Sequence, residues 1–187
     1  MHTILGVILV ASIAFVGTMF DNVFAFAAQL VVTEPTRFRR VGWAHALAIS
    51  TIIVLAGGVA SLLAPLPLRW IGLLCVAPFG FALHFWRHRA TTREQFRRGS
   101  VTTFALTIGR GSDNLAVWIP LIRANDFAHA SLSIATLTLW EMAFLFSAMR
   151  LAVHPRIVDW GNEHAAAFMP YAYVILGVLI LFECRTI

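Results

Sequence analysis

Residues 101–122 read V-T-T-F-A-L-T-I-G-R-G-S-D-N-L-A-V-W-I-P-L-I, an apolar run with polar residues in its middle. The length of the run suits a helix that crosses a bilayer, because about 20 residues span roughly 30 Å of hydrocarbon. The polar interruption consists of Gly109, Arg110, Gly111, Asp113 and Asn114. A charged residue at that depth costs roughly 3 kcal/mol on insertion scales, and such residues usually face inward and are functional. The two glycines predict a locally unwound turn, which membrane depth tolerates only beside a protein cavity.

A second Asp-Asn pair, Asp21-Asn22, interrupts the apolar run of residues 3–32 in the same way. Each pair lies in the first of three apolar runs, which divides the chain into halves 1–98 and 99–187. Because each half has an odd number of runs, the two halves would cross the membrane in opposite directions. Inverted repeats with a polar site near the membrane midplane build many secondary transporters. We therefore expect the two pairs to face each other across a polar site.

The composition excludes a soluble domain. The 187 residues are 59% hydrophobic and 12% charged, and the mean hydropathy is +0.80. The apolar runs are residues 3–32, 41–64, 70–86, 101–122, 131–152 and 165–182. We expect one all-α integral membrane domain over residues 1–187, with six transmembrane helices arranged as two inverted three-helix repeats. The first run is too long for an upright crossing, so it tilts, extends past the bilayer or breaks near Asp21. A polar segment, residues 154–164, precedes the last run.

The arginines set the expected orientation. The sequence has 14 basic residues, all of them arginine and most of them in short loops between the apolar runs. One side of the membrane would carry Arg37, Arg39, Arg40, Arg87, Arg89, Arg93, Arg97, Arg98 and Arg156, and the other side only Arg69, Arg123 and Arg185. The positive-inside rule places the first group in the cytoplasm and both termini outside the cell membrane. Such a distribution sets topology and is not that of a nucleic-acid-binding surface.

Asp21 and Asp113 are the strongest candidates for metal ligands, and their neighbours Asn22 and Asn114 add carbonyl oxygens that cations accept as ligands. The competing interpretation is structural, since Arg110 and Asp113 are three residues apart on one helical face and could neutralise each other. Candidate accessory residues are Glu141, Arg110, Ser112 and Thr18. For Glu141 and Arg110 the functional and structural interpretations are equally favoured. His45 and His84 are better explained as hydrogen-bonded histidines near helix ends than as ligands.

Four segments of the chain resemble the cadmium-resistance transporter family, within the lysine-exporter superfamily. They are T-M-F-D-N at 18–22, I-G-R-G-S-D-N with W-I-P-L at 108–121, L-L with P-F-G-F at 73–81, and M-P with I-L-G at 169–177. Two positions depart from the family pattern: Asn22 stands where a second acid is usual, and Arg110 where a neutral asparagine is usual. The resemblance implies export of a divalent metal. The residues alone support an intramembrane polar site with inverted symmetry.

The leading hypothesis is a secondary exporter of a divalent, cadmium-like cation, with Asp21 and Asp113 as ligands and proton acceptors. No nucleotide-hydrolysis or protease motif is present, so we expect no enzyme and no cofactor beyond the transported ion. One alternative is an exporter of an amino acid or small zwitterion, with Arg110 holding the carboxylate. A remote alternative is an intramembrane aspartyl protease, although one extra residue separates Gly111 from Asp113. The residues do not distinguish which ion is transported, which ion is coupled to it, or whether the protein is a monomer or a homo-oligomer.

Overall fold

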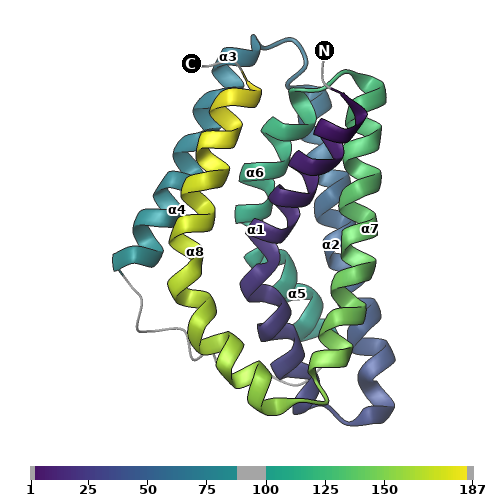
Figure 1. The fold of residues 1–187 in the computed structure, drawn as a ribbon. Coiled ribbons are helices and arrows are strands. Elements are labelled where there is room, and N and C mark those ends of the chain that lie inside the picture. The colour runs from purple at the N-terminus through teal and green to yellow at the C-terminus, as the bar shows by residue number, and fades with distance from the viewer. Residues whose placement is uncertain (1–2, 88–99, 185–187) are drawn as a thin grey trace.

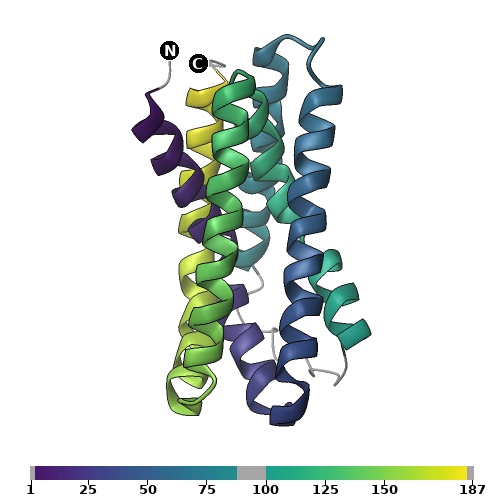
Figure 2. The ribbon, with the colours of Figure 1, turned by 90° about the vertical axis from the view of Figure 1, so that its right-hand side faces the viewer.

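The computed structural model describes residues 3–87 and 100–184, and every regular element in these ranges is helical. The long helices are α1 (Ile4–Val31), α2 (Phe38–Leu62), α7 (Phe127–Leu151) and α8 (Pro155–Glu183). The shorter ones are α3 (Leu68–Ile71), α4 (Val76–Arg87), α5 (Ser100–Arg110) and α6 (Ser112–Arg123), with 3-10 turns at Pro35–Arg37 and Gly72–Cys75. The helices run along one long axis, and both described chain ends lie at the same end of the bundle (Figures 1 and 2).

Four helical stretches are long and apolar enough to cross a membrane: Ile4–Val31, Phe38–Leu62, Leu68–Arg87 and Phe127–Leu151. A fifth is α8 if its two parts, which meet at 56°, count as one span. Large apolar side chains cover much of the outer surface, as contact with lipid requires. The expected all-α, multi-pass membrane fold is therefore confirmed. The arrangement as six crossings in two inverted repeats stays a prediction.

The run at residues 101–122 breaks at Gly111, where the sequence predicts an unwound turn. Helices α5 and α6 have 11 and 12 residues, so each is only about 17–18 Å long, too short to cross a bilayer. They follow each other along the bundle axis (Figure 1). A Cβ atom at Gly111 would overlap the side chain of Ile52 on α2. The glycine thus permits the close approach of α2 at the break.

The first apolar run behaves differently from its counterpart. Helix α1 continues without interruption through Asp21 and reaches Val31. Its 28 residues correspond to about 42 Å of helix, which exceeds the hydrocarbon thickness. Of the three ways to fit this run into a bilayer, a break near Asp21 is therefore wrong.

The polar segment at 154–164, which precedes the last apolar run in the sequence, is mostly helical. Helix α8 starts at Pro155, a residue whose fixed φ angle suits the first turn. Its first part, Pro155–Ala165, forms an arm that turns under the bundle before Ala167–Glu183 rises beside α4 (Figure 1). Pro170 explains the bend, because a proline ring clashes with the carbonyl four residues earlier, at the junction of the two parts.

The two halves of the chain are intertwined. Helix α1 packs mainly against α7 and α8, whereas α2 packs against α5, α6 and α7. The first helix of each half therefore lies on helices of the other half. Phe15 of α1 stacks on Trp118 of α6 with ring centroids 5.9 Å apart, and both side chains are buried. Burial of these rings is a large part of what holds α1 against α6.

Arg123 links α6 to the turn between α2 and α3 at one end of the bundle. The guanidinium of Arg123, in the last turn of α6, donates hydrogen bonds to the carbonyls of Leu63, Ala64 and Leu66. These carbonyls lie at and just beyond the end of α2, where a helix leaves backbone acceptors without partners. Arg123 therefore fixes α6 to the α2–α3 turn.

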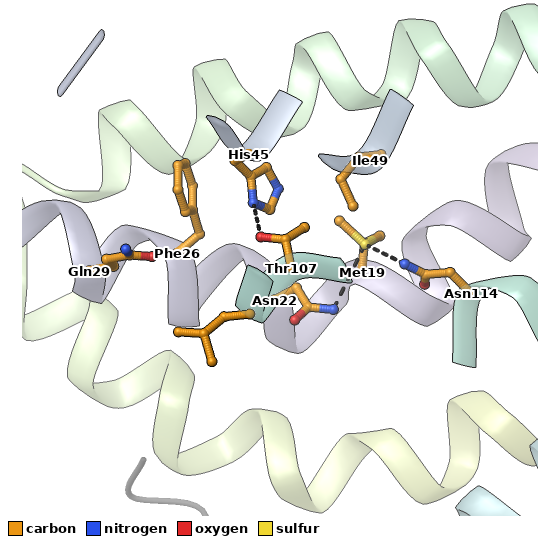
Figure 3. Close-up of a pocket in the computed structure, with 9 residues that line it drawn as sticks. Met19, Asn22, Phe26, Gln29, His45, Ile49, Thr107 and Asn114 are labelled. Carbon is orange, nitrogen blue, oxygen red and sulfur yellow. Dashed lines mark hydrogen bonds between the residues drawn. The ribbon is translucent and has the colours of Figure 1, made fainter. Parts of the chain in front are cut away.

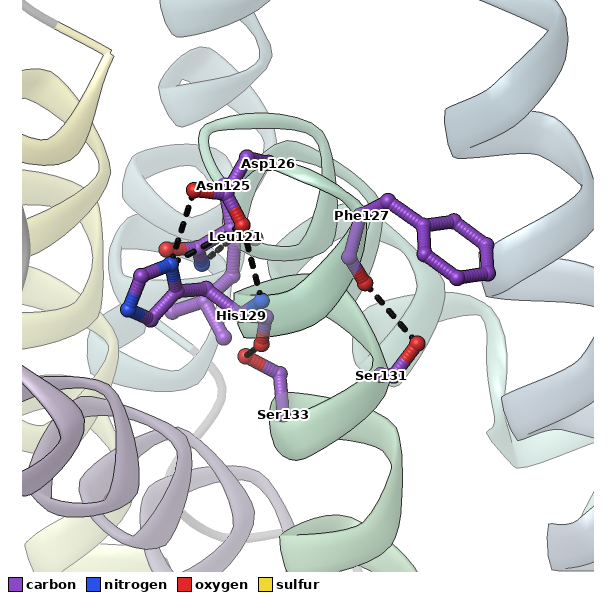
Figure 4. Close-up of polar contacts among 7 residues, drawn as sticks. All are labelled: Leu121, Asn125, Asp126, Phe127, His129, Ser131 and Ser133. Carbon is purple, nitrogen blue, oxygen red and sulfur yellow. Dashed lines mark hydrogen bonds and ion pairs between the residues drawn. The ribbon is translucent and has the colours of Figure 1, made fainter.

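The turn from α6 to α7 is held by a helix cap (Figure 4). Asp126 Oδ1 accepts a hydrogen bond from the backbone N–H of His129 at 2.9 Å, and the His129 ring Nδ1 lies 2.9 Å from the same carboxylate. The backbone hydrogen bond, and then the one from the ring, hold the pKa of Asp126 below its usual range. Asn125 Nδ2 donates to the Leu121 carbonyl and completes the end of α6.

We expect Gly161→Ala to lower the free energy of unfolding by roughly 1–3 kcal/mol, because an added methyl group would overlap the rigid ring of Phe24 and lift the α8 arm from α1. Thermal unfolding in detergent measures the change. Gly80→Ala is the matched control, since a Cβ atom there meets nothing within 4 Å. Equal stability of the two variants would contradict this packing.

Candidate functional site

A small cavity of about 30 Å³ is lined by the asparagines of both Asp-Asn pairs (Figure 3). Helices α1, α2, α5 and α6 form its wall. The lining residues are Met19, Asn22, Phe26, Gln29, His45, Ile49, Leu106, Thr107 and Asn114. Amide, imidazole, hydroxyl and thioether groups thus meet inside an otherwise apolar bundle. Polar cavities at this depth are the usual place for a binding site in a membrane protein.

The asparagines of the two pairs converge on one sulfur atom, as Figure 3 shows. Asn114 Nδ2 lies 3.4 Å from Met19 Sδ, and Asn22 Nδ2 lies 3.8 Å from the same atom. Asn22 Nδ2 also donates to the Thr18 carbonyl at 3.4 Å. The carbonyl oxygen of Asn114 is buried and accepts no hydrogen bond from the described residues. The structure therefore brings the two asparagines together at Met19.

Tyr173 connects the aspartates. Its hydroxyl donates a hydrogen bond to Asp113 Oδ2, and both Asp113 and Asp21 act on it electrostatically. Tyr173 is fully buried, and its ring stacks on Phe85 of α4 with centroids 5.7 Å apart. The second oxygen of Asp113, Oδ1, accepts from the Asn114 backbone N–H at 2.9 Å. The two candidate ligands therefore lie around one tyrosine that no sequence motif indicates.

Tyr173 does not stand out in the sequence, because it lies in the apolar run of residues 165–182, where an aromatic residue is expected to face lipid or core. A signal was nevertheless present. A tyrosine inside a membrane helix carries a hydroxyl that needs a partner, and carboxylates in other helices are the natural acceptors.

A second polar pair borders the cavity. His45 Nε2 lies 3.7 Å from Glu141 Oε1, and the two side chains are only 5% and 1% exposed. The other ring nitrogen, Nδ1, lies 3.1 Å from the hydroxyl of Thr107. The ring is stacked between Phe26 and Phe144, with centroid distances of 4.3 and 5.0 Å. His45 is hydrogen-bonded, as predicted, but it also lines the cavity and faces Glu141, which the sequence could not indicate.

The remaining candidates are placed only in part. The Thr18 hydroxyl donates within its own helix, to the carbonyl of Ala14 at 3.0 Å, and Thr18 does not line the cavity. The side chains of Arg110 and Ser112 lie outside the described part of the structure. Within residues 3–87 and 100–184, no group of three or more His, Cys, Asp or Glu side chains is close enough to hold a metal ion. A cation here would need neutral ligands as well, and the asparagines and Met19 are at hand.

Comparison with known proteins identifies the family. A family model described as "Cadmium resistance transporter" matches residues 44–187, well over half of the chain. The chain belongs to this family. The resemblance found in the sequence is therefore confirmed, and the matched range includes Asp113, Asn114, Glu141 and Tyr173. No curated protein and no solved structure matches the chain.

The family describes transporters of a metal ion and not enzymes. An intramembrane protease therefore does not fit, and the metal ion is a substrate of the protein. Residues 1–43, which contain Asp21 and Asn22, lie outside the matched range. The case for the first Asp-Asn pair consequently depends on the structure, which brings Asn22 to the same sulfur as Asn114.

We expect Tyr173→Phe to lower the free energy of unfolding by roughly 1–3 kcal/mol, since the half-buried Asp113 carboxylate loses a hydrogen-bond donor. Thermal unfolding in detergent at neutral pH tests this. Tyr171→Phe, on the exposed side of the same helix, is the control and should change little. A similar small effect for both variants would mean that the Tyr173–Asp113 contact does not stabilise the site.

Proposed function

We propose that this protein is a secondary exporter of a divalent, cadmium-like cation, which binds between the Asp21-Asn22 and Asp113-Asn114 pairs in exchange for protons. The observation that carries the proposal is the convergence of both asparagines on Met19 at a polar cavity. Two carboxylates match the charge of a divalent ion. The thioether of Met19 suits a soft cation better than a hard one.

The chemistry of the site follows from these groups. Asp21 and Asp113 supply negative charge, and the Asn114 carbonyl, which accepts no hydrogen bond from the described residues, supplies a neutral ligand oxygen. The Tyr173 hydroxyl holds Asp113 in a fixed orientation. When the cation leaves, protons replace its charge, because negative charge this deep in a bilayer is costly. The transported cation and protons thus alternate at one site.

The position of the cavity supports access from the cytoplasm. Its lining follows α1 from Met19 to Gln29, which is about 15 Å toward the α1–α2 turn. That turn and the start of α2 carry Arg37, Arg39 and Arg40, the charges that the positive-inside rule assigns to the cytoplasm. Both termini would then lie outside, at the opposite end of the bundle (Figure 1). The Arg-rich segment 88–99, which supports the same orientation, lies outside the described residues.

Helix packing supports a single domain of two inverted repeats, with α5 and α6 together forming one broken crossing. Exchanging the halves relates α1 to α5–α6, α2 to α7, and α3–α4 to α8. The contacts of α1 with α7 and α8 then correspond to those of α6 with α2 and α4. The α2–α7 and α4–α8 contacts map onto themselves.

Replacing Asp21 or Asp113 with asparagine should reduce cadmium flux in proteoliposomes to background, because each change removes a ligand and a charge. Asp159→Asn, at an exposed position of the α8 arm, is the matched control and should keep full flux. Thermal unfolding shows whether each variant is folded. Full flux by Asp113→Asn would rule out the proposed site.

Arg110 separates metal from amino-acid export. In a metal exporter a nearby cation opposes binding of a second positive charge, so Arg110→Asn should preserve cadmium flux or tighten cadmium binding. In an amino-acid exporter the same change removes the carboxylate partner and should abolish transport. Flux of cadmium and of a panel of amino acids measures the difference.

The orientation is tested by single cysteines in a background that lacks Cys75 and Cys184. Phe127→Cys lies at the start of α7, where the native side chain is 90% exposed, and should react with a membrane-impermeant maleimide on intact cells. Thr36→Cys, in the α1–α2 turn, should react only after permeabilisation. The reverse labelling pattern would overturn the proposed orientation.

A further inference from the structure

We infer that His45 and Glu141 form a proton-binding pair of this transporter, separate from the Asp-Asn pairs, which gives up its proton when a cation occupies the cavity. This inference rests on the proposed function. It assigns one exchanged proton to a pair of residues that are not themselves ligands of the cation.

The first support is that the pair is buried while the atoms that face each other are not held by hydrogen bonds. Glu141 Oε1 and Oε2 and His45 Nε2 have no hydrogen-bond partner among the described residues. The distance of 3.7 Å between Nε2 and Oε1 is too long for a hydrogen bond and short enough for a proton to be shared after a small movement. A buried polar group without a partner costs about 1–3 kcal/mol. A purely structural pair would be expected to close this gap.

The second support is the isolation of the pair from other charges. The surrounding helices present Phe26 from α1, Thr107 from α5 and Phe144 from α7 to the His45 ring. No other charged group among the described residues acts on either member. Asp21 and Asp113 act on Tyr173 instead. The charge of the pair therefore depends on its own proton and on whatever enters the cavity.

The third support is charge balance. With one proton the pair is neutral overall, whether the proton is on the carboxylate or shared as an ion pair. Without it the pair carries one net negative charge, which a low-dielectric interior opposes strongly. His45 lines the cavity, so a cation there supplies the compensating positive charge. Binding of the cation and release of the proton are thus linked through space, and departure of the cation draws the proton back.

The test uses the full-length protein in proteoliposomes, with cadmium as the probe and two assays. The first measures cadmium accumulation driven by a gradient of one pH unit, and the second measures exchange of labelled for unlabelled cadmium at equal pH. Each exchanged proton supports about tenfold accumulation under that gradient. Glu141→Gln, which cannot give up a proton, should therefore accumulate about tenfold less cadmium than the wild type while its exchange continues.

Three further variants test this interpretation. Glu141→Asp keeps a titratable carboxyl and should restore the accumulation in part or in full. Glu163→Gln, an exposed acid on α8, is the matched control and should behave as the wild type. His45→Gln removes the other member of the pair and should reproduce the defect of Glu141→Gln, which keeps the test decisive if one variant does not fold.

A direct measurement completes the test. A pH-sensitive dye reports protons released when cadmium is added to the protein in detergent, and Glu141→Gln should release about one proton fewer per bound ion than the wild type. Unchanged release and unchanged accumulation in Glu141→Gln would overturn the inference. Loss of exchange and of cadmium binding together would also overturn it, because the pair would then be part of the cation site. A wild type that neither binds nor exchanges cadmium would instead reject the proposed function.

Discussion

The hydrogen bond from the Tyr173 hydroxyl to Asp113 is the contact on which the arrangement of this bundle depends. A carboxylate at membrane depth must receive donors from its own protein, because no water is available in the hydrocarbon. Tyr173 lies on α8 beyond the bend, and Asp113 begins α6 just after the break, so the contact joins the two irregular parts of the fold. It also brings α8 close to α1, whose Asp21 acts on the same tyrosine.

The polar groups around this contact form three sets with different partners. The aspartates lie with Tyr173, whereas the asparagines turn toward Met19 and the cavity. His45 also lines the cavity, where its ring lies between Phe26 and Phe144 and its Nε2 atom faces Glu141. Each of these three sets contains residues from both halves of the chain. The site therefore exists only when the halves are interleaved, and neither half could form it alone.

Much of the architecture could be predicted from the sequence, since membrane helices are recognised by length and apolarity. The break at Gly111 could be predicted too, because glycines beside charges rarely occur in an unbroken span. The partner of each buried polar side chain could not be predicted from the sequence. Periodicity tells which face of a helix is polar but not which helix that face meets, so the pairing of His45 with Glu141 and of Tyr173 with Asp113 stayed hidden. The helical arm at Pro155–Ala165 could not be predicted, because its polar residues resemble a loop and the sequence does not show that Gly161 packs against Phe24.

The continuity of α1 and the break before α6 make the two Asp-Asn pairs chemically unequal. Asp21 projects from the middle of a helix whose backbone N–H groups are all bonded within it, so only its side chain faces the site. Asp113 sits in the first turn of α6, where several backbone N–H groups lack intrahelical acceptors and the helix macrodipole contributes about half a positive charge. Part of the charge of Asp113 is thus balanced by the start of its own helix, an interaction that the interior of α1 does not offer to Asp21. The same two residues, Asp-Asn, therefore have a different backbone environment in each half of the chain.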